Sequence, residues 1–264
     1  MPHQDRDAGR SVEEAWRAMS QATWDERAAW WEEISEAQRR GGEVLAGAEG
    51  AIRGLALQPG HRLLDAGCGT GQYAVAFAAW GARVDAVDLS PAMINRARAH
   101  AAASGLDISF HVADLARLPF PEATFDAVQA RLSLHFAFDL PATLRELGRV
   151  LRPEGRLYAS VPGPLSPISA NVWQRHLDPG RRANNYVTPW ELEALLGHLG
   201  WEVTAHLPHF GPSPDGAAPT FDPSVIEGSH LPMALQQAAA TTWAMIANHP
   251  HRPLTNPADD RPGP

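Results

Sequence analysis

The sequence of 264 residues contains no lysine, and all 22 of its basic residues are arginine. Without a lysine amine the chain cannot form a Schiff base, anchor pyridoxal phosphate or place a lysine after a glycine loop to bind nucleotide phosphates. The lysine–glutamate ion pair of protein kinases is excluded for the same reason. The absence of this one residue type therefore removes several classes of enzyme.

Cysteine is almost as rare, since Cys68 is the single one in the chain. One cysteine forms neither an internal disulfide nor a cysteine-rich metal site, which is compatible with a reducing cytoplasm. The 12 histidines show no spacing typical of metal ligands, so no metal site is expected. Residues 1–10 are polar and no run of about 18 apolar residues is present, so we expect neither a signal peptide nor a membrane span.

The charge balance is acidic, with 30 acidic residues against 22 basic ones and a formal net charge of −8. Proteins that bind nucleic acid usually carry a basic surface, so we expect no nucleic-acid partner for this acidic chain. The length fits one domain with an added lid or two small domains. A hydrophobic content of 44% is enough for a substantial core.

Two regions with different hydrophobic patterns make up the first four fifths of the chain. Residues 1–60 carry apolar side chains at helical spacing, interrupted at Gly41 and Gly42, and are expected to form an N-terminal helical lid. Residues 61–207 alternate short apolar runs with helical stretches, which predicts an α/β fold with a Rossmann-like, doubly wound, mostly parallel sheet. Within this core, residues 163–187 are interpreted as an insertion on the substrate side.

The C-terminal region, residues 208–264, is expected to form a loop, a helix over residues 231–247 and a disordered tail from His249, with the loop and helix serving as further lid elements. Helix starts are expected at Ser90, which precedes a proline, and at Thr188, which opens a capping box. Strands are expected from residue 63 onward and over residues 82–87, 108–112, 125–130, 156–161 and 201–207.

The most informative stretch, residues 63–71, joins the first expected strand of the core to its first helix. Its glycines follow a Gly-x-Gly-x-Gly spacing, which differs from the Gly-x-Gly-x-x-Gly of dinucleotide sites. Asp65 lies two residues before Gly67, the first of these glycines. Because glycine permits sharp turns and close approach of a ligand, the loop predicts a binding site at this end of the sheet.

Two further acids follow the next two expected strands. Asp88 ends the second strand, where a carboxylate can accept hydrogen bonds from both hydroxyls of a ribose. Asp114 follows the third strand and can accept from an exocyclic amine such as that of adenine. Three carboxylates at consecutive strand ends suit a cationic nucleoside and would repel a pyrophosphate. The alternative is that aspartates at strand ends cap the helices that follow.

From about residue 62 to residue 207 the chain resembles the class I S-adenosylmethionine-dependent methyltransferases. The segments that carry the resemblance are residues 64–71, 87–93, 113–115, 118–120, 125–128 and 151–155. The resemblance implies a seven-stranded sheet with the cofactor S-adenosylmethionine across the carboxyl ends of the strands. It also implies a final strand in an antiparallel hairpin. That strand is not evident after residue 207, and we expect it either within residues 216–227 or lost from a remodelled C-terminal part.

The resemblance also assigns roles to particular residues. Asp65 would order the loop near the methionine ammonium, Asp88 would bind the ribose, and Asp114 would bind the adenine, whose ring Leu89 and Met93 would sandwich. The backbone near Arg131 would contact the methionine moiety. The full expected cofactor site consists of Asp65, Gly67, Cys68, Gly69, Asp88, Leu89, Met93, Ala113, Asp114, Leu115 and Arg131.

On the substrate side, His135 follows the fourth expected strand and is the candidate general base, because histidine is the commonest proton acceptor near neutral pH. The alternative is a histidine that packs or binds cofactor. No Asn-Pro-Pro-Tyr segment and no Pro-Cys nucleophile is present, which disfavours methylation of DNA bases. We therefore expect a small organic acceptor of the kind found in specialised metabolism. We also expect a cytoplasmic protein, and a homodimer is compatible with the sequence.

Two other functions remain open from the sequence. A protein of the same fold can bind S-adenosylmethionine and catalyse a step without methyl transfer, such as a cyclisation or an elimination. A protein of this fold can also be a non-catalytic binding subunit. The presence of Asp65, Asp88 and Asp114 argues against that function here. Because the chain has no lysine, arginine side chains would have to bind an anionic acceptor. The candidates are Arg131, Arg175, Arg181 and Arg182.

Overall fold

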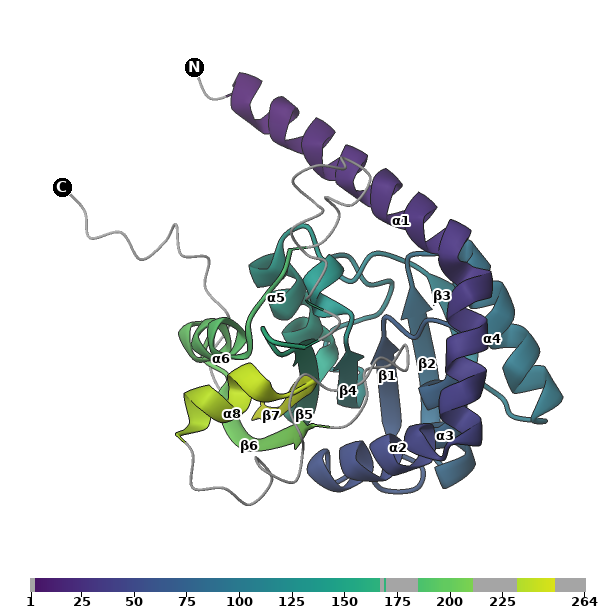
Figure 1. Ribbon diagram of the computed structural model, residues 1–264. Coiled ribbons are helices and arrows are strands. Elements are labelled where there is room, and N and C mark those ends of the chain that lie inside the picture. The colour runs from purple at the N-terminus through teal and green to yellow at the C-terminus, as the bar shows by residue number, and fades with distance from the viewer. Residues whose placement is uncertain (1–2, 167–168, 170–184, 211–231, 250–264) are drawn as a thin grey trace.

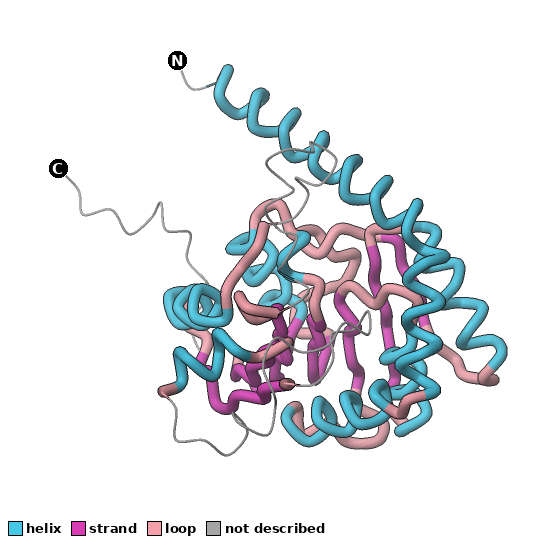
Figure 2. The backbone as a smooth tube through the Cα atoms, in the orientation of Figure 1, coloured by secondary structure: helices cyan, strands magenta, loops and turns pink. Residues whose placement is uncertain are grey.

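The computed structural model describes residues 3–166, 169, 185–210 and 232–249. A seven-stranded sheet with the order β3-β2-β1-β4-β5-β7-β6 forms the centre, with helices on both faces (Figures 1 and 2). The strands are β1 (Arg62–Ala66), β2 (Arg83–Asp88), β3 (Ser109–Val112), β4 (Phe125–Arg131), β5 (Leu151–Pro162), β6 (Glu202–His209) and β7 (Thr242–Asn248). The expected Rossmann-like architecture is confirmed.

Strands β1 to β5 are mutually parallel, so their carboxyl ends share one edge of the sheet. Both faces of such a sheet are covered, which explains why β1 and β4 consist mostly of buried residues without a polar alternation. Asp65 on β1 lies opposite Gln129 on β4. The register thus places two polar side chains side by side near this carboxyl edge.

The helices between the strands begin where the sequence places them. Helix α3 (Gln72–Trp80) follows the glycine loop, and α4 (Pro91–Ala103) is capped by Ser90, whose hydroxyl accepts from the Met93 N–H at 3.1 Å. Helix α5 (Leu140–Val150) precedes β5, and α6 (Pro189–His198) begins with the expected capping box at Thr188. Side-chain caps at the starts of α4, α5 and α6 satisfy backbone N–H groups that a helix start leaves unpaired, whereas α3 follows Gly71 without a side-chain cap.

The C-terminal segment differs from the expectation. The helix predicted over residues 231–247 is wrong: a short helix, α8 (Met233–Ala239), is followed by strand β7. Strand β7 runs antiparallel between β5 and β6 and supplies the final strand, which therefore lies outside residues 216–227. Because β7 is buried on both faces, its residues form a continuous apolar run, which periodicity cannot separate from a buried helix.

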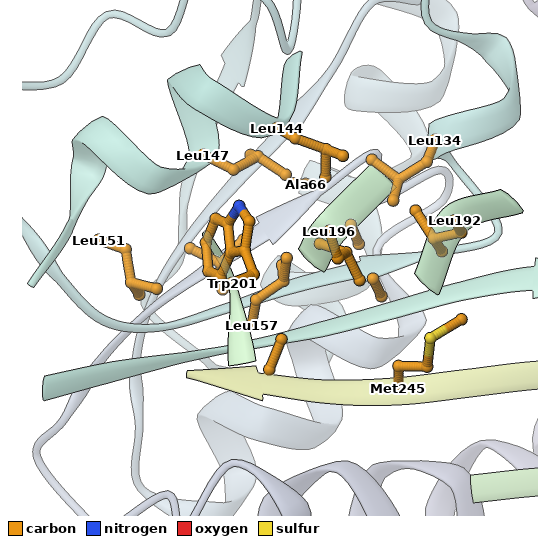
Figure 3. Close-up of a cluster of buried hydrophobic side chains, with 14 of the residues drawn as sticks. Ala66, Leu134, Leu144, Leu147, Leu151, Leu157, Leu192, Leu196, Trp201 and Met245 are labelled. Atoms are coloured by element: carbon orange, nitrogen blue, oxygen red, sulfur yellow. The ribbon is translucent and has the colours of Figure 1, made fainter. Parts of the chain in front are cut away.

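Hydrophobic side chains fill the space on both faces of the sheet. One cluster lies between the sheet and helices α5 and α6, where Leu144, Leu147, Leu196 and Trp201 pack over Leu157 of β5 (Figure 3). A second cluster lies against helix α2 (Glu43–Gly54) and helix α3. Burial of this apolar area on both faces is the main favourable contribution to folding.

The N-terminal region forms one long helix, α1 (His3–Arg40), and the shorter α2, separated at Gly41 and Gly42 as expected. Figure 1 shows α1 running diagonally past the sheet beside α4 and ending near α2. At the other end, His249 is fixed by hydrogen bonds to the carbonyls of Gly155 and Gly148, while residues 250–264 of the expected tail lie outside the described part of the chain. Among the described residues, no helix is both long and apolar enough to span a bilayer.

Candidate functional site

Backbone hydrogen bonds join the loops after β1, β2 and β3 into one surface. The N–H groups of Gly67 and Cys68 donate to the carbonyl of Val87 at 2.8 and 2.9 Å, and the Ala113 N–H donates to the carbonyl of Asp88 at 3.1 Å. The structure therefore brings together the segments that contain Asp65, Asp88 and Asp114, as the shared carboxyl edge of parallel strands requires.

The glycine loop is closely approached from two sides. Gly67 has a φ of 83°, and a Cβ there would lie 2.3 Å from the Cβ of Ser133, whose hydroxyl donates to the Ala66 carbonyl at 2.7 Å. A Cβ on Gly69 would lie 3.1 Å from Nε1 of Trp31 on α1. The side-chain directions of these two glycines are thus taken by protein atoms, so a residue with a Cβ does not fit at either position without a shift of its neighbours.

Asp88 joins the glycine loop to the start of α4. Its Oδ2 accepts from the Gly69 N–H and its Oδ1 from the Ser90 N–H, both at 2.9 Å. Burial raises the pKa of this carboxyl above its usual range, although these backbone hydrogen bonds oppose the rise. Asp88 does not cap α4, because Ser90 has that role. The remaining lone pairs of its two oxygens can accept from the hydroxyls of a ribose.

Buried polar atoms without partners occur on Asp65, Gln129 and Gln72. Its Oδ1 receives a long hydrogen bond of 3.5 Å from Gln129 Nε2, whereas its Oδ2 has none. The Oε1 of Gln129 and both amide atoms of Gln72, at the start of α3, are also buried and unpartnered. Unpaired buried polar groups are costly, so they mark a place where a polar ligand group belongs. A primary ammonium, with three donors and a positive charge, matches the unpaired oxygens.

Burial also raises the pKa of the Asp65 carboxyl. Only 2% of the residue is exposed, and burial raises its pKa to about 7. The charge of Asp88 acts in the same direction, while Gln129 and Arg131 lower the pKa. A cationic ligand would favour the ionised carboxylate. These residues therefore fit the methionine end of S-adenosylmethionine.

The side chain of Arg131 is engaged within the protein. Its Nη1 donates to the Tyr158 hydroxyl at 2.9 Å, and its guanidinium lies 4.6 Å from the centre of the Tyr73 ring. Because these contacts engage the side chain, a contact of the backbone here with the methionine moiety stays a prediction. The other arginines considered for an anionic acceptor, Arg175, Arg181 and Arg182, lie outside the described residues.

The remaining expected cofactor residues differ in exposure. Leu89 and Leu115 are half-buried, and Leu115 packs against the larger hydrophobic cluster. Met93 is 2% exposed and belongs to the core side of α4, so Leu89 is the more accessible of the two residues expected to flank the adenine. Burial raises the pKa of the Cys68 thiol well above its usual value, so this residue is not an activated nucleophile.

Asp114 is covered by helix α1. Its Oδ1 accepts from the Ala116 N–H at 2.9 Å, and its Oδ2 accepts from Nε of Arg17 at 2.8 Å. No spacing signal in the sequence could have found Arg17, which lies 97 residues away. Gln72 and Gln129 were missed as well, since a single buried amide beside a strand or loop has no recognisable pattern.

The candidate base, His135, lies in the short 3-10 helix Leu134–Phe136 after β4. It is 3% exposed, its Nδ1 is buried without a partner, and burial lowers the pKa of its imidazole to about 4. The adjacent Phe136 meets Trp24 of α1 edge to face, with ring centres 4.9 Å apart. The imidazole is thus neutral at neutral pH and can accept a hydrogen bond, next to the aromatic contact that closes α1 over this loop.

Comparisons with known proteins agree with this geometry. A family model described as a methyltransferase domain matches residues 64–159. Malonyl-[acyl-carrier protein] O-methyltransferase of Serratia marcescens is 37% identical over 131 residues, which are 49% of each chain. The 27-O-demethylrifamycin SV methyltransferase of Amycolatopsis mediterranei is 38% identical over 148 residues, 53% of this chain and 51% of the relative. The chain thus spans about half the length of these curated relatives.

A solved structure supports the fold. The [4+2]-cyclase SpnF superposes with a TM-score of 0.57 at 23% sequence identity, over 77% of this chain and 79% of that one. Together, the sheet order, the glycine loop and the matched model show that residues 64–159 form a methyltransferase domain with the fold of the class I S-adenosylmethionine-dependent methyltransferases. S-adenosylmethionine is the cofactor of this family.

Proposed function

We propose that this protein transfers a methyl group from S-adenosylmethionine to an oxygen atom of a small organic acceptor by in-line displacement. The observation that carries the proposal is the arrangement of Asp65, Asp88 and Asp114 at one edge of the sheet, around a glycine loop and beside unpaired buried acceptors. Oxygen as the acceptor atom is proposed from the similar O-methyltransferases, which this chain matches over about half of their length.

The bound cofactor supplies an electrophilic methyl group on a cationic sulfur. The residues of the chain bind and orient it: Asp88 holds the ribose hydroxyls, Asp114 the adenine amine, and Asp65 with Gln129 the ammonium. Because the leaving group is already activated, the remaining tasks are alignment of the acceptor and exclusion of water.

We propose that Nδ1 of His135 accepts the proton of the acceptor hydroxyl. Its neutral state at pH 7 and its unpaired buried nitrogen support this role. A pKa near 4 makes it a weak base, which suits an acceptor whose proton leaves late, when the oxygen has become acidic by forming its bond to carbon.

The N-terminal region is assigned as a lid over this site. Trp24 meets Phe136, Trp31 covers Gly69, and Arg17 binds Asp114, so α1 contacts loops after three different strands. These contacts support exclusion of water from the cofactor. A cytoplasmic location and a homodimer stay predictions from the sequence.

A panel of acceptors tests the function. We expect S-adenosylhomocysteine and a methylated product from incubation of the protein with S-adenosylmethionine and compounds that carry a carboxyl, a phenol or an aliphatic hydroxyl. Formation of methylthioadenosine would instead indicate an elimination. Conversion of a polyene acceptor to an isomer, with the methyl group retained on the cofactor, would instead indicate a cyclase such as SpnF.

A further inference from the structure

Helix α1 is tied to the Asp114 loop by a network of four charged side chains. Arg17 donates from Nε to Asp114 Oδ2 at 2.8 Å and from Nη2 to Glu13 Oε1 at 2.7 Å. The same Glu13 oxygen accepts from Nη2 of Arg117, also at 2.7 Å. The loop after β3 and the helix that covers it are therefore joined at two points, one at each end of the Asp114–Arg117 turn.

The oxygens of Asp114 still have capacity for a ligand. A carboxylate offers about four acceptor positions. The Arg17 Nε takes one on Oδ2, and the Ala116 N–H takes one on Oδ1. These two contacts thus leave a lone pair available on each oxygen, and the Arg17 contact fixes the plane of the carboxylate. An adenine amine that donates to Asp114 would bind directly beside the Arg17 contact.

The same helix is fixed at a second point along the cofactor site. Oδ1 of Asp25 accepts from the Ser90 hydroxyl at 2.5 Å and from the Ala92 N–H at 3.1 Å, next to Asp88. Two turns separate Arg17 from Asp25, so one face of α1 follows the strand ends from the expected adenine position to the expected ribose position.

We propose that Arg17 is a positioning residue for adenine recognition, which holds Asp114 in its binding orientation and thereby couples closure of α1 to binding of the adenosine moiety. The inference rests on the proposed function, because it takes Asp114 as the partner of the adenine amine. A simple surface ion pair is the competing explanation, since pairs with about a quarter of each side chain exposed contribute little by themselves. The two explanations differ in whether Arg17 and Asp114 act on the ligand together.

The test is a double-mutant cycle on ligand affinity. Titration calorimetry with S-adenosylhomocysteine would compare the wild type with Arg17→Gln, Asp114→Asn and the double variant. We expect Arg17→Gln to raise Kd about three- to tenfold, and the double variant to bind within about twofold of Asp114→Asn, because Arg17 acts through the carboxylate. The matched control is Arg27→Gln, an exposed arginine on the same helix, which should leave Kd unchanged.

Two further readouts separate positioning from fold stability. Arg17→Lys keeps a cation near Asp114 and should bind within about threefold of wild type. Hydrogen exchange of residues 13–25 should slow when S-adenosylhomocysteine binds the wild type, and slow less in Arg17→Gln. The proposal would be overturned if the fold-changes in Kd of the two single variants multiply in the double variant. It would also be overturned if binding of S-adenosylhomocysteine leaves the hydrogen exchange of residues 13–25 unchanged. Wild-type protein that binds no S-adenosylhomocysteine would overturn the proposed function itself.

Discussion

Gln129 on β4 donates to Oδ1 of Asp65 on β1 across 3.5 Å, and the second oxygen of that carboxylate has no partner. One long hydrogen bond does not replace the hydration that a carboxylate loses when 98% of its residue surface is covered, so the pKa of Asp65 rises to about 7. A fraction of the free protein therefore carries a neutral Asp65 near neutral pH. Binding of a cation beside it is coupled to loss of that proton.

The first prediction is that cofactor binding releases a proton near pH 6.5. Below pH 7 Asp65 is mostly protonated in the free protein, and the cationic methionine end favours the ionised form, so affinity should rise with pH and level off above about 7. Titration calorimetry in buffers of different ionisation enthalpy measures the proton count. Asp65→Asn should abolish both the release and the pH dependence, and equal enthalpies in all buffers would refute the coupling.

The second prediction concerns the ribose. Asp88→Ala should weaken binding of S-adenosylmethionine by about 1.5–3 kcal/mol, the range for hydrogen bonds to a charged group. Part of the loss arises within the protein, because the Gly69 and Ser90 N–H groups lose their acceptor. Asp107→Ala, at an exposed carboxylate near the start of β3, is the control and should bind as the wild type does. Equal affinities of the Asp88 variant and this control would contradict the ribose assignment.

The third prediction is an acid-dependent loss of stability that arises from His135. Its folded-state pKa of about 4 lies below the ordinary value of 6.5, so its contribution is complete above pH 6.5 and is lost as the pH falls from 6.5 towards 4. As the pH falls from 7 to 5, the contribution of His135 to the free energy of unfolding falls by about 2 kcal/mol. Asp65 acts in the opposite direction, because its raised pKa stabilises the protein at low pH and that contribution fades as the pH rises through about 7.

Urea unfolding of the wild type and of His135→Leu at both pH values isolates the histidine. The Asp65 contribution is common to the two proteins and cancels in the difference. We expect the free energy of unfolding of His135→Leu to gain about 2 kcal/mol relative to the wild type between pH 7 and pH 5. Parallel pH profiles would show that the imidazole is not buried as a neutral group.

The fourth prediction tests the close approach of Ser133 to the glycine loop. Gly67→Ala combines a positive φ with a Cβ placed 2.3 Å from that of Ser133, so it should lower the free energy of unfolding by at least about 2 kcal/mol. Gly105→Ala is the matched control, because Gly105 has a φ of 64° and open space around it. Its cost should be limited to the backbone, about 1 kcal/mol. Equal losses in the two variants would show that Ser133 does not restrict the loop.

The sequence predicted the gathering of Asp65, Asp88 and Asp114 because parallel strands end at a common edge, and a residue's place after its strand is readable from periodicity. It did not predict β7, since a strand buried on both faces has no alternation. It also could not indicate that Arg17 binds Asp114. That contact depends on where α1 lies beside the sheet. Tertiary contacts such as those of Trp24, Trp31 and Asp25 fix that position, and no local pattern in the sequence indicates it.

The central claim is methyl transfer from S-adenosylmethionine to a small acceptor, and isotope transfer tests it most directly. With a cofactor that carries a trideuterated methyl group, mass spectrometry should show one intact trideuteromethyl group on the acceptor for each S-adenosylhomocysteine formed, and Asp88→Ala should slow both in proportion. Product formed without S-adenosylhomocysteine, or methylthioadenosine in its place, would contradict the account.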